Sequence, residues 1–192
     1  MDIIIATNNA HKVEEFKRIL TPLGFNVFSL KDKNIKIDVE ENGTTFEENA
    51  IIKAKAIYDI VKLPVIADDS GLCVDALNGE PGIFSARYGG KDLDQHSKNS
   101  LILKRLEGVE NRSARFVCAI AYIDLKGKIH TFVANCEGSI GYEEKGKNGF
   151  GYDPLFMVGD KSFSEVSSEE KDLLSHRGKA NKMLCEFIAK QG

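Results

Sequence analysis

Short apolar runs alternate with amphipathic stretches over the first third of the chain. Residues 3–6 form an apolar run rich in β-branched side chains, which predicts a buried strand. Over residues 11–20, apolar side chains recur at helical spacing and predict a helix. Residues 26–29 and 35–38 predict two further strands. This early order of strand, polar turn, helix and strand is typical of an α/β protein.

A well-marked helix and an acidic segment follow. Thr45, with Glu48 three residues later, has the capping-box pattern and predicts the start of a helix over residues 46–61. Residues 65–67 predict another buried strand. That strand leads into Asp68-Asp69-Ser70-Gly71, whose composition predicts an acidic turn.

The rest of the chain mixes long β-rich runs with helical segments. The expected elements are a helix over residues 93–106, an antiparallel hairpin of residues 114–124 and 128–140, an ordered loop over residues 146–154, and a helical part from residue 168 with a break near residues 175–178. Together with the early alternation, these elements predict an α/β fold with a mixed β-sheet. We expect residues 1–192 to form a single domain.

Composition and charge narrow the possible partners. The chain has 192 residues, of which 42% are hydrophobic, so it can bury a substantial core. Its formal net charge of −3 argues against binding to a nucleic-acid backbone. The apolar runs are too short to span a membrane, and the N-terminus has an acid where a signal peptide needs Lys or Arg. We therefore expect a cytoplasmic protein that binds neither nucleic acid nor membrane.

Six residues between the first strand and the first helix are candidates for phosphate binding: Thr7, Asn8, Asn9, Ala10, His11 and Lys12. An Asn or Thr at this place can cap the helix, which is a purely structural role. The backbone N–H groups, the helix dipole and Lys12 can also bind an anion together. The pattern alone fits both interpretations.

Carboxylates occur in two separate segments. Asp68 and Asp69 follow a buried strand, and open α/β sheets bind ligands at the carboxyl ends of their strands. Glu40 and Glu41 lie in a different segment, ahead of the capped helix. Hard oxygen ligands from two segments suit Mg²⁺, which takes one or two carboxylates together with substrate phosphates and water. A plain turn and a solvated acidic loop are the structural alternatives.

Two patterns late in the chain carry aromatic and cationic groups. Phe150-Gly151-Tyr152-Asp153 sets two aromatic rings beside a carboxylate, an arrangement that can stack on a base and hydrogen-bond to it. Ser175-His176-Arg177-Gly178, with Lys171 just upstream, brings cations to a helix start. A loop held by core aromatics and a capping Ser are the alternatives. Residues 141–148 resemble a Walker A loop but lack its final Ser or Thr, so we reject that interpretation.

Several motifs stand in an order that belongs to one family. They are Thr-Asn-Asn-x-x-Lys, Thr-Phe-x-Glu-Asn-Ala, Ala-Asp-Asp-Ser-Gly-Leu, Pro-Gly-Ile-x-Ser-Ala-Arg-Tyr, Gly-Phe-Gly-Tyr-Asp-Pro and Ser-His-Arg-Gly-x-Ala. By these motifs the chain resembles the inosine/xanthosine triphosphate pyrophosphatase family over about residues 3–190. The resemblance implies Mg²⁺-dependent hydrolysis of ITP, dITP and XTP to the monophosphate and pyrophosphate. It also implies a homodimer and a long mixed sheet with helices on both sides, two lobes and a substrate groove between them.

The resemblance also implies roles for particular residues. Thr7 to Lys12 would hold the triphosphate of the purine nucleotide, and Glu41 and Asp69 would hold the metal. Asp69 would also be the general base, and Ser70 would contact the substrate. The residues expected around the nucleotide are Phe150, Gly151, Tyr152, Asp153, Lys171, His176 and Arg177. Lys53, inside a helix rather than in a loop motif, is a further candidate for a phosphate contact.

Two other functions fit parts of the pattern. The septum-inhibition type nucleotide pyrophosphatases have a related architecture and act on other nucleotides, but Ser-His-Arg-Gly and Phe-Gly-Tyr-Asp argue against them. A catalytically silent nucleotide-binding module is the second alternative. The presence of both Glu41 and Asp69 argues against it, because a sensor has no need of a base.

Overall fold

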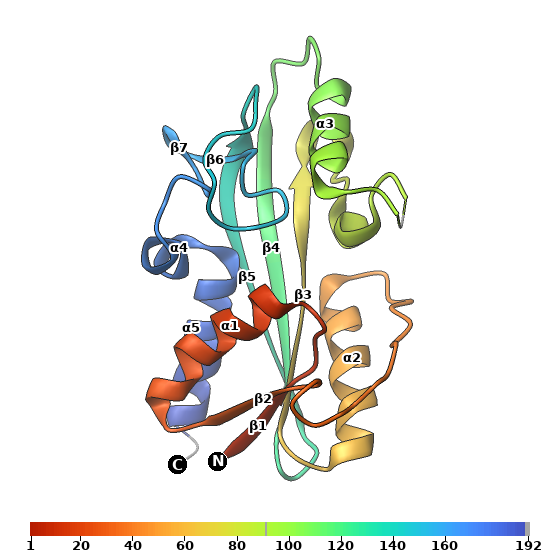
Figure 1. Cartoon of the computed structure of the whole chain (residues 1–192), viewed down its shortest axis with the longest axis vertical. Helices are drawn as coiled ribbons and strands as arrows, with labels where there is room; N and C mark the ends of the chain where they lie inside the picture. Colours follow the sequence, from red (N-terminus) through yellow and green to blue (C-terminus); the bar gives the residue numbers. More distant parts are fainter. Residues whose placement is uncertain (91, 191–192) are drawn as a thin grey trace. The chain divides into compact units, whose positions relative to one another are not determined.

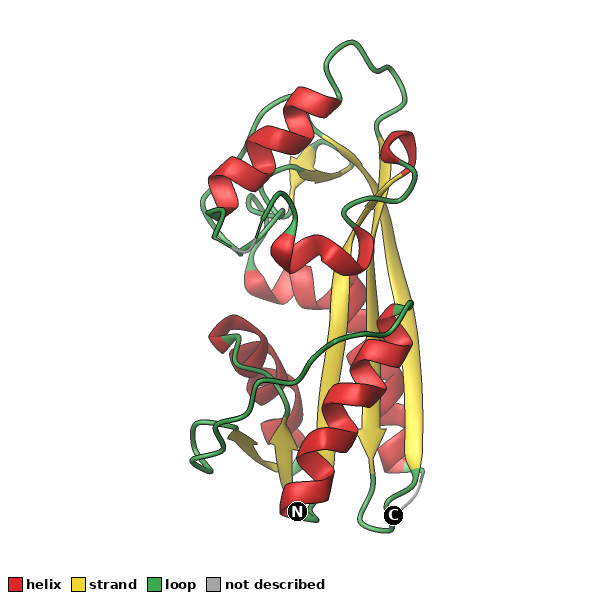
Figure 2. Cartoon of the chain, turned by 90° about the vertical axis from the view of Figure 1, so that its right-hand side faces the viewer, coloured by secondary structure: helices red, strands yellow, loops and turns green. Residues whose placement is uncertain are grey.

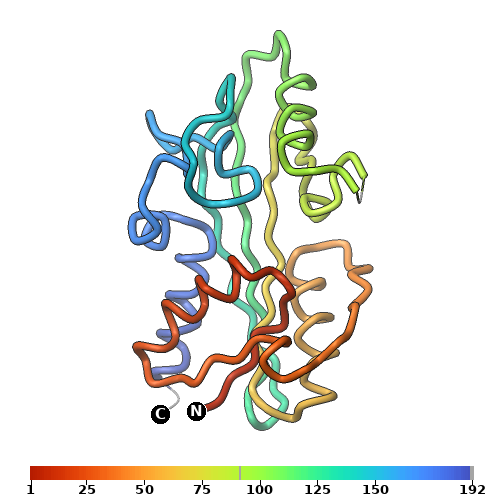
Figure 3. Tube along the Cα trace, viewed as in Figure 1, coloured from red at the N-terminus to blue at the C-terminus, as the bar shows by residue number. Residues whose placement is uncertain are grey.

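The computed structural model describes residues 1–90 and 92–190. The chain divides into two compact units, and each is built from separate parts of the sequence. Unit 1 comprises Met1–Asp69, Cys118–Ala134 and Lys179–Gly192, and unit 2 comprises Ser70–Val117 and Asn135–Gly178. Figure 3 traces these parts by colour: red to yellow, green to teal, and blue segments all contribute to unit 1.

Seven strands form one sheet in the order β2-β1-β3-β4-β5-β6-β7. The strands are β1 (Asp2–Ile5), β2 (Asn26–Ser29), β3 (Val65–Val74), β4 (Ser113–Ile123), β5 (Ile129–Ile140), β6 (Phe156–Val158) and β7 (Lys161–Ser162). The α-helices are α1 (Ala10–Leu20), α2 (Phe46–Val61), α3 (Gln95–Arg105), α4 (Ser168–Leu174) and α5 (His176–Ala189). β1 pairs in parallel with β2 and β3, whereas β6 pairs antiparallel with β5 and β7. The expected α/β fold with a mixed sheet is confirmed.

Helices cover both faces of the sheet in unit 1. Ile3 and Ile5 of β1 pack in one cluster with Phe16 of α1 and Leu184 of α5, whereas Ile4 packs in another cluster with α2. Figure 1 shows α1 and α5 on one side of these strands and α2 on the other. Because both faces are buried, residues 3–5 of β1 form an uninterrupted apolar run instead of an alternating one.

The strand order β2-β1-β3 decides where unit 1 can bind a ligand. α1 leads from β1 to β2 on one face of the sheet, and α2 leads from β2 to β3 on the other. The connection after β1 runs to one neighbour, β2, and the connection after β2 crosses back over β1 to the other neighbour, β3, so the chain changes direction at the carboxyl end of β1. Such a topological switch point is where open α/β sheets bind their ligands. The segment after β1 and the acidic residues of β3 both lie there.

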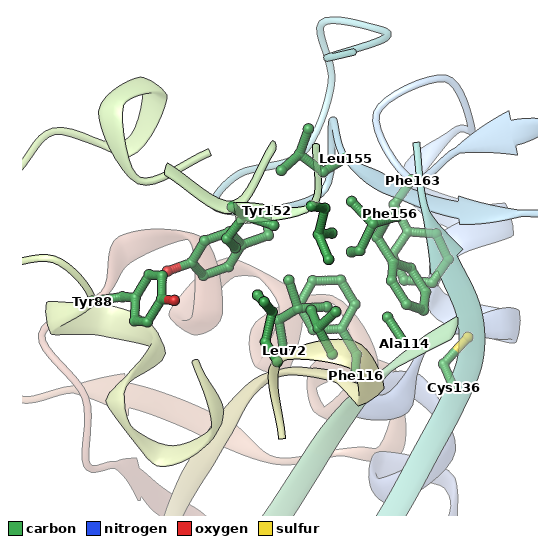
Figure 4. Packing of buried hydrophobic residues seen from close by; sticks show 14 residues of the cluster. Leu72, Tyr88, Ala114, Phe116, Cys136, Tyr152, Leu155, Phe156 and Phe163 are labelled. Carbon is green, nitrogen blue, oxygen red and sulfur yellow. The ribbon is translucent and has the colours of Figure 1, made fainter. Parts of the chain in front are cut away.

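The core of unit 2 is rich in aromatic side chains. The Phe116 ring lies 4.6 Å from the ring of Phe156 and 5.9 Å from that of Phe163, centroid to centroid. Leu72 of β3 joins the same cluster, which also includes Tyr152 from the loop between β5 and β6 (Figure 4). Tyr152 of one late motif belongs to this core, and His176 of the other stacks on Phe116, so the core supports both motifs.

Two local predictions are wrong. Residues 35–38 form no strand: the chain between β2 and α2 is irregular (Figure 2). The apolar side chains of Ile35 and Ile37 alternate with polar ones because both pack against the α2 side of the core. This packing requires no pairing with a neighbouring strand. The acidic residues 68–71 form no turn, because β3 runs straight through them. Charged residues can lie inside this strand because lysines reach both carboxylates.

Other predictions hold. The helical C-terminal part breaks at Ser175, between α4 and α5. β4 and β5 are neighbours in the sheet, joined by a turn in which the Asp124 N–H donates to the Lys128 carbonyl at 3.0 Å. In the part of the chain that the structure describes, every helix is too short or too polar to cross a membrane.

Candidate active site

The loop between β1 and α1 is organised by Asn9. Its side-chain oxygen accepts hydrogen bonds from the backbone N–H groups of His11 at 3.0 Å and Lys12 at 3.3 Å. The Asn9 N–H donates to the Thr7 hydroxyl at 3.2 Å. The capping role is therefore confirmed. The Asn9 cap occupies two N–H groups that could otherwise donate to an anion. The ammonium group of Lys12 is therefore the main positive charge that this loop offers.

One side of this loop opens onto a hollow of about 740 Å³. Thr7, Asn8 and Ala10 line it together with three lysines, Lys17, Lys31 and Lys36, and two acids, Glu14 and Asp38. A phosphate-bearing ligand thus has an accessible, partly basic approach to the segment after β1 within unit 1.

Two consecutive aspartates of β3 point to opposite faces of the sheet. Asp68 meets Lys12 of α1, with 2.9 Å between Nζ and Oδ2. Asp69 meets Lys53 of α2, with 3.4 Å between Nζ and Oδ1. Side chains alternate along a strand and the two helices cover opposite faces, so each carboxylate receives its own lysine. A turn at this place would not give that arrangement.

The Lys53 ammonium also lies 3.2 Å from Oε2 of Glu41. Asn49, which is 1% exposed, donates from Nδ2 to Oδ2 of Asp69 at 3.2 Å. Asn49 and Lys53 are four residues apart on α2, so they project from the same face of the helix. We call this set the acid–lysine cluster, with the members Lys12, Glu41, Asn49, Lys53, Asp68 and Asp69.

Burial and charge pull the pKa values of this cluster in opposite directions. Burial raises the pKa of Asp69, as does the Glu41 carboxylate, while Lys53 and Lys12 lower it; the net direction is upward. Burial lowers the pKa of Lys53, but the attraction of Asp69, Asp68 and Glu41 outweighs it, so that pKa is raised. Lys53 therefore stays protonated, and its charge holds the two carboxylates together.

The donor set of the acid–lysine cluster fits a divalent cation of the Mg²⁺ type. Glu41 and Asp69 offer carboxylate oxygens around the same point, which Lys53 now contacts. Residues 1–90 and 92–190 contain no group of three or more His, Cys, Asp or Glu side chains that would hold a metal by themselves. Mg²⁺ commonly completes its coordination with substrate phosphates and water, so two carboxylates are a sufficient protein contribution.

A second cluster lies in unit 2. The Lys171 ammonium donates to Oδ2 of Asp153 at 2.7 Å, and the same oxygen accepts from the Phe150 N–H at 2.9 Å. Lys171 also lies 4.7 Å from the centre of the Phe150 ring. Gly149 has a φ of +73°, and a Cβ there would be 2.2 Å from the Asp153 carboxylate. Only glycine therefore permits this loop to close on Asp153.

The junction between α4 and α5 supplies an imidazole and a guanidinium group. The Ser175 hydroxyl accepts from the Gly178 N–H at 3.0 Å, which is the expected cap of α5. The His176 ring stacks on Phe116 at 4.7 Å between centroids. Arg177 donates from Nη2 to the Ser70 hydroxyl at 2.8 Å. We call this set the aromatic–cation cluster, with the members Ser70, Phe150, Asp153, Lys171, His176 and Arg177.

The predicted residues Gly151 and Tyr152 have a supporting place in this loop. Tyr152 is 5% exposed, packs in the core of unit 2, and donates from its hydroxyl to the Ser85 carbonyl at 2.7 Å. Burial raises the pKa of this hydroxyl strongly, so it remains a donor. Its ring anchors the loop, as the structural alternative for this motif proposed. Gly151 has a φ of +64°, a turn conformation that favours glycine.

Asn49 is the member of the acid–lysine cluster to which the sequence pattern gave no role. Asp68 was among the candidate carboxylates, but it was placed in a turn. Asn49 could have been found, because it is a polar residue next to Ala50 and one helical turn before Lys53, on a face that is otherwise apolar. The partner of Asp68 comes from a distant helix, and no local pattern indicates it.

Comparison with known proteins identifies the family of this chain. Residues 3–187 match the Ham1 family. The dITP/XTP pyrophosphatase of an Exiguobacterium species is 48% identical over 191 residues, which cover 98% of this chain and 97% of that relative. The dITP/XTP pyrophosphatase of Bacillus licheniformis is 49% identical, with 97% of both chains covered.

A solved structure agrees with these relatives. The Ham1 protein of Staphylococcus aureus has a TM-score of 0.91 and 40% sequence identity, with both chains fully covered. The chain therefore belongs to the Ham1 family.

Proposed function

We propose that this protein hydrolyses ITP, dITP and XTP to the nucleoside monophosphate and pyrophosphate. Its family membership and the names of its relatives support this activity. The observation that carries the proposal is the buried Asp69 carboxylate, which Asn49 holds on one side and Lys53 on the other. A base held in place beside fixed cations is what hydrolysis of a phosphoanhydride requires.

The acid–lysine cluster provides the chemical step. A water molecule attacks the α-phosphorus, the bond from that phosphorus to the oxygen bridging to the β-phosphate breaks, and pyrophosphate leaves. Asp69 orients the water and accepts its proton. The charges of Lys12 and Lys53 offset the negative charge of the phosphates as it grows in the transition state.

Mg²⁺ is part of this proposal, with Glu41 and Asp69 as the residues that would hold it. When bound, it would neutralise phosphate charge and lower the pKa of a coordinated water. The chemistry of the two carboxylates supports this role, together with the resemblance to the pyrophosphatase family. The expected homodimer and cytoplasmic location rest on that resemblance and on the sequence, and they belong to the same proposal.

The aromatic–cation cluster provides recognition of the base. Hypoxanthine and xanthine carry a C6 carbonyl, which accepts hydrogen bonds, where adenine carries an amino donor. Arg177 and Lys171 have only donors and cannot accept from that amino group. Adenine would leave buried donors unpaired, and mismatches of this kind can reject an analogue by as much as roughly 10⁴–10⁵-fold.

The test is pyrophosphate release with dITP, ATP and dTTP as parallel substrates, with Mg²⁺ and with a chelator. We expect hydrolysis of dITP at a kcat/KM far above those of ATP and dTTP, and its loss when the chelator is added. Hydrolysis that favours dTTP would instead support the septum-inhibition type of enzyme. Binding of dITP without pyrophosphate release would support a silent binding module.

A further inference from the structure

One polar side chain of α3, Asn99, reaches the loop that carries Phe150, and a second, Gln95, holds it in place. Asn99 is 2% exposed. Both polar atoms of its side chain make hydrogen bonds. Its Nδ2 donates to Oε1 of Glu144 at 2.6 Å and, more weakly, to the Gly151 carbonyl at 3.5 Å. Its Oδ1 accepts from Nε2 of Gln95 at 2.9 Å. Gln95 and Asn99 are four residues apart, so they share one face of α3.

Tyr152 of the same loop is held separately. Its hydroxyl donates to the Ser85 carbonyl at 2.7 Å. The Tyr152 ring lies in the unit 2 core beside Tyr88 (Figure 4). α3 therefore holds this segment at the Glu144 carboxylate and the Gly151 carbonyl, and Gln95 fixes the Asn99 side chain that makes both contacts.

The loop needs such external support because it lacks a regular backbone ladder. Residues 146–154 contain no helix and no strand. Gly149 and Gly151 both have positive φ values, so the loop reverses direction around Phe150. Phe150 and Asp153 are the loop residues that contact Lys171, so the position of the aromatic–cation cluster depends on the conformation of this loop.

We propose that Gln95 and Asn99 are positioning residues that fix the loop of residues 149–153 and so set the selectivity for the base. They do not touch the base themselves. This inference rests on the proposed function, because selectivity has meaning only if the protein acts on purine nucleotides. The hydrogen bond from Asn99 to a carboxylate is of the strong, charge-assisted kind, so its loss should release the loop.

The principal experiment exchanges the two groups of the Asn99–Glu144 pair. Asn99→Asp keeps the shape of the side chain but removes its donors and sets a second carboxylate against Glu144. Adding Glu144→Gln restores one hydrogen bond with donor and acceptor reversed. Ser100→Ala, at an exposed neighbour on α3, is the matched control.

Two readouts separate this inference from the proposed function. Backbone hydrogen exchange of the peptide spanning residues 149–153 should be about tenfold faster in Asn99→Asp, as for loss of a buried hydrogen bond to a charged group. The exchange rate should recover in the double variant and stay unchanged in Ser100→Ala. The ratio of kcat/KM for dITP to that for dATP should fall and recover in parallel.

The results separate the positioning role of Asn99 from its link to selectivity. Unchanged exchange in Asn99→Asp overturns the positioning role, whatever the activity does. Faster exchange with an unchanged dITP to dATP ratio overturns the link to selectivity. If the wild type does not hydrolyse dITP, the proposed function fails while the exchange measurement still reports on the loop. If Asn99→Asp does not fold, Glu144→Ala removes the same hydrogen bond from the loop side and is judged by the same criteria.

Discussion

The acid–lysine cluster and the aromatic–cation cluster both contain buried charges, but they hold them differently. In the first, carboxylates on β3 face lysines from two helices, and an amide completes the set. In the second, the cations lie against aromatic rings, and the one carboxylate, Asp153, is bonded to its own loop. A cluster held by charge suits phosphates and proton transfer. A cluster held by rings and hydrogen-bond donors suits a flat base with a particular edge.

Among the variants that test this contrast, Asp69→Asn should have the largest effect on activity. The amide keeps the shape of the side chain while it removes the base and one negative charge from the acid–lysine cluster. We expect the protein to fold and turnover of dITP to fall by about 10²–10⁴-fold, the usual contribution of a general base. Steady-state kinetics at saturating Mg²⁺ measures this. Turnover close to that of the wild type would remove Asp69 from the chemical step.

Arg177→Ala tests the second cluster. We expect kcat/KM to fall for dITP by roughly 10–100-fold, as for a lost hydrogen bond to a charged group, and to change much less for ATP. The ratio between the two substrates should therefore collapse. Equal losses for both substrates would show that Arg177 acts through its hydrogen bond to Ser70 or on the phosphates, and does not read the base.

Lys12→Ala should weaken the binding of the triphosphate. We expect KM for dITP to rise roughly tenfold, because one charge-assisted contact is lost, with a smaller change in kcat. Lys17→Ala on the same helix is the control, because Lys17 lines the neighbouring hollow and lies outside the cluster. If KM changes equally in both variants, a general positive field attracts the substrate and Lys12 has no specific contact.

Gly178→Ala tests the support of the aromatic–cation cluster through stability. A Cβ at this position would be 1.7 Å from the Asp172 carbonyl oxygen, so α4 and the start of α5 would have to move apart. Overpacking of this kind costs ~1–3 kcal/mol, and we expect Tm to fall by roughly 2–10 °C. Lys179→Ala, at the exposed next position, should leave Tm nearly unchanged. Equal Tm values for the wild type and Gly178→Ala would refute the close packing at this glycine.

The smallest expected effect is on the pH dependence of stability, through Glu48 at the start of α2. Hydrogen bonds from the backbone N–H and hydroxyl of Thr44 hold the pKa of Glu48 below its ordinary value of 4.5. A lowered pKa in the folded state means that the stabilisation is present above pH 4.5 and is lost as the pH falls through the folded-state value. Glu48→Gln should therefore show a slightly shallower fall of Tm below that pH. A steeper fall would contradict the capping role.

The sequence predicted most of the helices and strands because local patterns determine them. The cap at Thr45, the break at Ser175 and the buried run of β1 are all visible within a few residues. Residues 68–71 were misassigned because their local composition favours a turn, whereas the deciding partners, Lys12 and Lys53, lie far away in sequence. Asn99 was missed for the same reason, since its value depends on Glu144 in a distant loop.

The continuity of β3 restricts how this chain can vary in length. Asp69 and Ser70 are adjacent residues of one strand, and strand side chains alternate strictly between faces. A single inserted or deleted residue between Asp68 and Ser70 would turn every later side chain of β3 to the opposite face. Natural or engineered changes in length should therefore collect in segments that carry no site residue, such as the turn at residues 125–127 between β4 and β5, while this strand tolerates substitution but not insertion.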